Sequence, residues 1–150
     1  MTLPSPNTVR TVAVVILIGI GLIHFLTLPQ GFKIAGYLGV ALILAIGLAL
    51  AGAYALLHED QVGDQAGVWW YALCQGVLNS LGYLLSRTAG LPLVSHRVSA
   101  DWDSGLSMSL FYCGMLLTAL STWVLAVRWS RRRRGTPVAS ARDRDRLGGR

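Results

Sequence analysis

Residues 34–57 read IAGYLGVALILAIGLALAGAYALL, a run with no charged side chain. The uncharged window around this run extends from Lys33 to Glu59 and is 25 residues long. The hydrocarbon core of a bilayer is about 30 Å thick, and an α-helix needs roughly 20 apolar residues to cross it. A helix of a soluble protein would carry charges on its outer face. The run therefore predicts a transmembrane helix over residues 34–57.

Three further windows have the same character. Uncharged stretches of 22, 22 and 24 residues separate Arg10 from Lys33, Asp64 from Arg87, and Asp103 from Arg128. They predict helices near residues 10–28, 66–86 and 105–128. The composition agrees, because 53% of the residues are hydrophobic and only 13% are charged, against about 25% charged in soluble proteins. We expect an all-α, four-helix transmembrane bundle over residues 1–128.

The charged residues also predict the orientation of this bundle. The net charge is +6, and ten of the thirteen basic residues lie on the side of the two termini. Because basic loops stay inside, we expect both termini in the cytoplasm of a bacterium, with a multi-pass protein in its cytoplasmic membrane. The loop at 58–65 would then face inward, and the turn at 29–33 and the loop at 87–104 would face outward.

Residues 129–150 form a basic segment that we expect to be a cytoplasmic tail, disordered past about Gly135. Arg131, Arg132, Arg133 and Arg134 are candidates to bind anionic lipid headgroups, although such a cluster is also a common orientation signal. Nucleic-acid binding is a poor interpretation, since the cluster abuts a membrane span and belongs to no folded domain.

Small and polar residues predict how the helices pack. Gly47, Ala51 and Ala55 recur at every fourth position, and we expect this stripe to pack tightly within the bundle, although it could instead serve a partner. The third helix carries a polar stripe around Gln75 and Asn79, and the fourth helix has a matching one. These stripes either join the two helices or line a pocket for a polar ligand.

Candidate ligand-binding residues gather towards the outer rim. His24 is the one histidine within a predicted span, so a hydrogen bond to Asn79, Tyr83 or Ser107 at similar depth is expected. The outer loop is long and adds further polar groups. The full set of candidates is His24, Asn79, Tyr83, Arg87, His96, Asp101 and Asp103.

The sequence contains no motif for a catalytic centre, and no catalytic residue is predicted. His24 with His96, Asp101 and Asp103 could form a mixed nitrogen and oxygen metal site, but their spacing matches no specific metal motif. We therefore predict no metal ligand set and leave the cofactor unknown. Cys74 and Cys113 form no C-x-x-C pattern and are expected to act as small hydrophobic residues.

Two stretches carry a resemblance to a known family. One is Leu22-Ile23-His24 followed by Pro29, and the other is the run Gly82–Pro92, which includes Ser-Arg-Thr-x-Gly-Leu-Pro. Together they resemble small four-helix integral membrane proteins of actinobacteria and other GC-rich bacteria, over roughly residues 15–125. The resemblance implies a fold and a location but no activity. The matching positions His24, Tyr83, Arg87 and Pro92 fall at the outer rim.

These observations favour an accessory or interaction protein without enzymatic activity, which would contact the lipid bilayer and a membrane partner or a second copy of itself. The alternative is a membrane protein that binds a small molecule, metal or redox cofactor at the outer rim, around His24 and the 87–104 loop. A membrane enzyme or carrier of unspecified chemistry is a third possibility.

Overall fold

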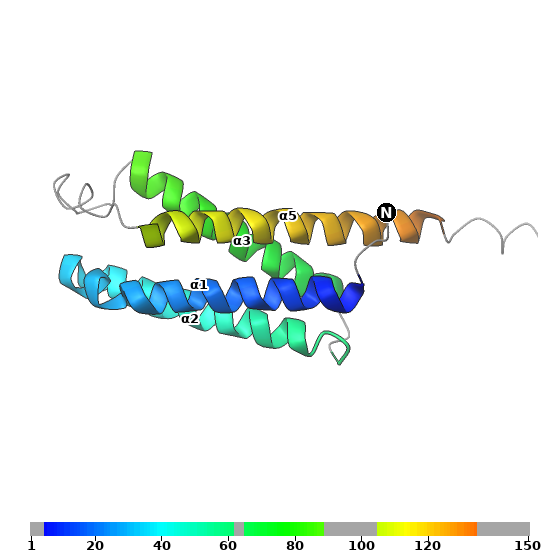
Figure 1. Ribbon diagram of the computed structural model, residues 1–150, viewed down its shortest axis with the longest axis horizontal. Helices are drawn as coiled ribbons and strands as arrows, with labels where there is room; N and C mark the ends of the chain where they lie inside the picture. The colour runs from blue at the N-terminus through cyan, green and yellow to red at the C-terminus, as the bar shows by residue number, and fades with distance from the viewer. Residues whose placement is uncertain (1–4, 62–64, 89–104, 135–150) are drawn as a thin grey trace, which may run out of the picture.

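The computed structural model describes residues 5–61, 65–88 and 105–134, which form four helices packed as a bundle (Figure 1). The helices are α1 (Pro6–Ile34), α2 (Gly36–Leu57), α3 (Gln65–Thr88) and α5 (Gly105–Arg134). Neighbours along the chain run antiparallel, and α1 packs mainly on α2 while α3 packs mainly on α5. The all-α bundle expected from the four uncharged windows is thus confirmed for the described residues.

The surface of this bundle is apolar. Large hydrophobic side chains lie exposed on every helix, including Val15, Leu44, Leu78 and Leu116. An apolar surface of this extent is suited to lipid rather than water. Among the described helices, α1, α2 and α5 are long and apolar enough to cross a membrane. α3 is less apolar because its buried face holds Gln75, Asn79 and Ser80.

The turn between α1 and α2 differs from the prediction. α1 begins after Ser5, whose hydroxyl oxygen accepts a hydrogen bond from the Thr8 N–H, and it continues through Pro29 to Ile34. The predicted end at residue 28 and the turn at 29–33 are therefore wrong. Only Ala35, in an extended conformation, separates the two helices. Pro29 removes one helical hydrogen bond, but the helix continues because its last turns pack directly on the start of α2.

The small residues of α2 face differently from the prediction. Gly47 and Ala51 are exposed, and a Cβ atom added at Gly47 would meet nothing within 4 Å. The neighbouring helix face is buried instead, and it consists of Ala49, Gly52, Ala53 and Leu56. The expectation that the stripe of Gly47, Ala51 and Ala55 packs inside the bundle was therefore wrong for Gly47 and Ala51, whereas Ala55 is half-buried against the core. Small residues occur on two neighbouring faces of α2, and the packing buries the face that contains Gly52.

Backbone contact between α3 and α5 occurs where two glycines meet. A Cβ atom added to Gly76 would lie 2.6 Å from Thr118 Oγ1 and 2.8 Å from the Gly114 carbonyl oxygen. A Cβ atom added to Gly114 would lie 2.7 Å from Ser80 Oγ and 2.9 Å from the Gly76 carbonyl oxygen. Each glycine is followed four residues later by a hydroxyl residue, as in small-residue crossings of membrane helices.

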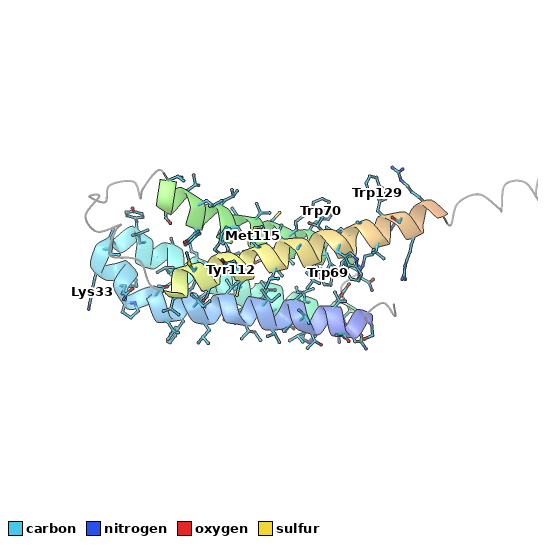
Figure 2. The ribbon with its side chains drawn as sticks, turned by 45° about the horizontal axis from the view of Figure 1, so that its top comes forward. Lys33, Trp69, Trp70, Tyr112, Met115 and Trp129 are labelled. Carbon is cyan, nitrogen blue, oxygen red and sulfur yellow. The ribbon has the colours of Figure 1, made fainter. Side chains whose placement is uncertain are left out.

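The start of α1, the end of α2, the start of α3 and the end of α5 meet at what we call the arginine end of the bundle. Arg10 pairs with Asp60 at 2.7 Å, and Glu59 pairs with Arg128. The Trp69 indole N–H donates to the Glu59 carboxylate at 2.9 Å, and Trp69 lies between the helices while Trp70 points outward (Figure 2). α5 continues beyond the predicted residue 128 to Arg134, so the predicted tail starts with helix. Residues 135–150 lie outside the described part.

Candidate functional site

A cavity of about 510 Å³ lies between α1, α2 and α3 in the half of the bundle away from the arginine end. Its wall is mostly apolar, with leucines and alanines of α2 and Leu78 of α3. The polar side chains that line it are His24, Thr27, Gln75, Asn79, Tyr83 and Ser86. An apolar chamber with a few convergent polar groups is the usual form of a small-molecule site.

The oblique path of α3 creates this cavity. α3 crosses the other helices at an angle (Figure 1), and it touches α2 near Tyr71, whose hydroxyl donates to the Leu48 carbonyl at 2.7 Å. At this contact Gly52 leaves space for the Tyr71 ring. Beyond it the two helices diverge. Leu44 and Leu78 line the cavity and are both 63% exposed, so the cavity opens between α2 and α3 to the outside of the bundle.

A chain of hydrogen bonds forms the polar side of the cavity. The Asn79 side-chain nitrogen donates to the Gln75 backbone carbonyl at 2.8 Å, which turns the amide oxygen towards His24. His24 Nε2 lies 3.0 Å from this oxygen. Because an amide oxygen can only accept, Nε2 carries the proton and Nδ1 of the neutral ring remains an acceptor. The expected hydrogen bond of His24 is confirmed, with Asn79 as its partner.

Two polar groups at this position keep hydrogen-bonding capacity. His24 is 7% exposed and Gln75 is 5% exposed. Among the described residues, the structure shows no partner for His24 Nδ1 or for the side-chain amide of Gln75. Thr27 and Ser86 differ, since their hydroxyls already donate to carbonyls of their own helices. A bound molecule would therefore find one acceptor and one amide on the polar side.

The sequence-predicted site residues are only partly brought together. His24, Asn79 and Tyr83 line the same cavity, and the Tyr83 ring packs on Phe111 with centroids 5.2 Å apart. Arg87 lies one turn further along α3, but its side chain is outside the described part of the structure. His96, Asp101 and Asp103 also lie outside the described residues. Within the described ranges, no three His, Cys, Asp or Glu residues cluster as metal ligands would.

The polar stripe of α3 lines a pocket, whereas its neighbouring stripe joins helices. Gln75, Asn79 and Ser86 line the cavity, and a Cβ atom added at Gly82 would meet nothing within 4 Å. The contact with α5 instead uses Gly76 and Ser80, one position further along the chain. Sequence reasoning missed this second stripe, although Ala72, Gly76 and Ser80 recur at every fourth position.

The buried pair of Glu59 and Trp69 at the arginine end was also not predicted from the sequence. Glu59 was considered only as a loop residue in predicting the orientation, for which acidic residues carry little weight. Taken together, the described helices form an apolar bundle with three candidate membrane spans, as in multi-pass helical membrane proteins, and with a cavity that opens between α2 and α3. No family model, curated protein or solved structure matches this chain.

Proposed function

We propose that this membrane protein binds an apolar small molecule that carries a hydroxyl group, in the cavity between α1, α2 and α3. The observation that carries the proposal is the His24–Asn79 hydrogen bond, which leaves Nδ1 of His24 as an acceptor at the polar side of a mostly apolar chamber. The chamber has a volume of about 510 Å³, within the range of about 300–1,000 Å³ typical of ligand pockets.

The polarity of the site favours this ligand class. With Nε2 donating to Asn79, the histidine offers only an acceptor to the chamber, which suits a hydroxyl donor. The Gln75 amide supplies a donor and an acceptor and would complete the contacts of the same hydroxyl. No charged side chain lines the chamber among the described residues, so an ionised headgroup would be left without a counter-ion.

The ligand would enter from the bilayer, since the opening between Leu44 and Leu78 faces the lipid side of the bundle. In this proposal α3 is the fourth span, with its polar face inside and Leu81 and Leu84 exposed to lipid. We further propose the bacterial cytoplasmic membrane, with both termini in the cytoplasm, from the distribution of basic residues. Membership of the actinobacterial family that the sequence resembles belongs to the same proposal.

A pair of photoreactive probes tests the ligand chemistry. We would label the purified full chain with a long-chain alcohol that carries a diazirine, and with the methyl ether of the same alcohol, which cannot donate. One hydrogen bond contributes about 0.5–1.5 kcal/mol, so the alcohol should bind about two- to twelvefold more tightly and label the cavity walls. Replacing His24→Leu should abolish this preference. His58→Leu is the matched control, because His58 bonds the Tyr54 carbonyl of its own helix, outside the cavity.

Two results would contradict the proposal. In one, the alcohol and the ether label wild-type protein equally. In the other, the His24→Leu variant discriminates as well as the wild type while the control variant remains folded.

A second candidate function is the accessory role, in which the helices bind a membrane partner. The exposed stripe of Gly47 and Ala51 on α2 favours it, because small exposed residues let another helix approach closely. Replacing Gly47→Leu should weaken cross-linking to such a partner without affecting labelling by the alcohol probe. Unchanged cross-linking would argue against this surface.

A further inference from the structure

A second cavity of about 330 Å³ lies at the arginine end, separate from the proposed ligand chamber. Residues of α1, the turn at 59–60, α3 and α5 line it. Three guanidinium groups belong to its wall, those of Arg10, Arg128 and Arg131. The rest of the wall combines an apolar and aromatic part, Val9, Val124, Val127, Trp69 and Trp123, with four polar residues, Asn7, Glu59, Asp60 and Gln65. The cavity thus combines cationic groups with an apolar floor.

Carboxylates neutralise two of the three arginines. Asp60 pairs with Arg10 at 2.7 Å, and Glu59 pairs with Arg128 while it also accepts from Trp69. Arg131 has no acidic partner among the described residues. The cavity wall therefore carries one uncompensated positive charge. The ion pairs also hold Arg10 and Arg128 in place, and each guanidinium keeps N–H donors that its carboxylate does not use.

We propose that this cavity binds the phosphate headgroup of an anionic phospholipid. The phosphate would lie between Arg131 and Arg128, because guanidinium groups bind phosphate oxygens in a bidentate manner. The glycerol and the first acyl carbons would lie on Val124 and Val127. Basic pockets between membrane helices on the inner side bind such headgroups, and tryptophan is enriched at that depth. A free phosphate would use the arginines but would leave the apolar floor uncovered.

This site is more specific than the basic segment that follows it. Arg131, Arg132 and Arg133 are all exposed on α5, but of the three only Arg131 lines the cavity. The Arg133 guanidinium instead lies over the Trp129 ring, 4.4 Å from its centroid. If anionic lipid were held only by the general positive charge of this segment, replacing Arg131 or Arg132 would weaken binding equally. If the lipid binds in the cavity, replacing Arg131 should weaken binding more than replacing Arg132. This difference makes the proposal testable.

The test uses the full chain in mild detergent at physiological salt. Binding of short-chain phosphatidylglycerol is followed by tryptophan fluorescence, since Trp69 and Trp123 line the cavity. Short-chain phosphatidylcholine and inorganic phosphate serve as comparison probes. Replacing Arg131→Gln should weaken phosphatidylglycerol binding about tenfold, the effect of losing one charge-assisted hydrogen bond. Arg132→Gln removes the same charge next to the cavity and should change binding by less than about twofold.

Three results would overturn the proposal. Equal losses in the two variants would show general attraction by a basic surface. Equal binding of phosphatidylglycerol and phosphatidylcholine by the wild type would show that the negative headgroup is not recognised. Competition by inorganic phosphate at concentrations equal to those of the lipid would show a phosphate site without a lipid role. A loss confined to Arg131→Gln, with only partial recovery in Arg131→Lys because lysine keeps the charge but not the bidentate geometry, would support the headgroup site.

Discussion

Replacing Gly76→Ala should separate α3 from α5, because the added methyl group has no room at the crossing. Its carbon would lie 2.6 Å from Thr118 Oγ1, 2.8 Å from the Gly114 carbonyl oxygen and 2.9 Å from the Thr118 backbone nitrogen. Favourable contacts require about 3.5–4.0 Å. Two of the three atoms belong to the backbone of α5, so no rotation of a side chain relieves the overlap and the helices must move apart.

The expected magnitude follows from the cost of overpacking, about 1–3 kcal/mol for one inserted carbon. A glycine-to-alanine change also favours the helix itself by up to about 1 kcal/mol. Gly82→Ala is the matched control, because it makes the same change on the same helix and its Cβ atom would meet nothing within 4 Å. The helix preference of alanine over glycine contributes equally to both variants. The difference between their free energies of unfolding therefore gives the cost of the methyl group at the crossing of α3 and α5.

The assay is unfolding of the purified protein by increasing SDS in mixed micelles, followed by far-ultraviolet circular dichroism and tryptophan fluorescence. We expect Gly82→Ala to unfold at or above the SDS midpoint of the wild type. Gly76→Ala should unfold at a lower SDS midpoint, with a free energy of unfolding about 1–3 kcal/mol below that of Gly82→Ala. Equal midpoints for the two variants would refute the close backbone crossing of α3 and α5.

Two further predictions concern buried polar groups. Glu59→Gln should lower the free energy of unfolding by about 1–2 kcal/mol, because the amide still accepts from Trp69 but no longer neutralises Arg128. The control is Asp60→Asn, since the Asp60 side chain is 77% exposed. This variant should lower the free energy of unfolding by less than about 0.5 kcal/mol in the same SDS titration. Ser121→Ala should leave the free energy of unfolding unchanged or raise it by up to about 1 kcal/mol, since the buried Ser121 hydroxyl has no hydrogen-bond partner among the described residues. Thermal unfolding measures this change. A loss of more than about 1 kcal/mol would show that the hydroxyl has a partner.

The helices and their order could be predicted from the sequence because the relevant signal is local. Charged residues such as Lys33 and Glu59 mark the ends of windows long enough to cross a bilayer, and that length requirement applies to each helix alone. A hydrogen bond of His24 could also be predicted, since a buried histidine needs a partner at similar depth, but the choice of Asn79 over Tyr83 and Ser107 came only from the structure.

Properties that depend on relative helix rotation could not be predicted in this way. The sequence offers two small-residue faces on α2, and nothing local distinguishes Gly47 from Gly52; the Tyr71 ring of α3 selects Gly52. On α3, neighbouring stripes through Gln75 and Gly76 are both polar or small, and the crossing with Gly114 decides which one lines the cavity. The cavity itself arises from the oblique path of α3 (Figure 1). The crossing angle of a helix cannot be predicted from the periodicity of its residues.

The one-residue connection at Ala35 has a consequence for how α1 and α2 can move. Because only Ala35 separates the two helices, they cannot separate at this end, and they can fold only as a hairpin. Lys33 lies near the tip of this hairpin, at the opposite end of the bundle from Trp129 (Figure 2). Lengthening the connection by a flexible insert would let the two helices dock independently of each other.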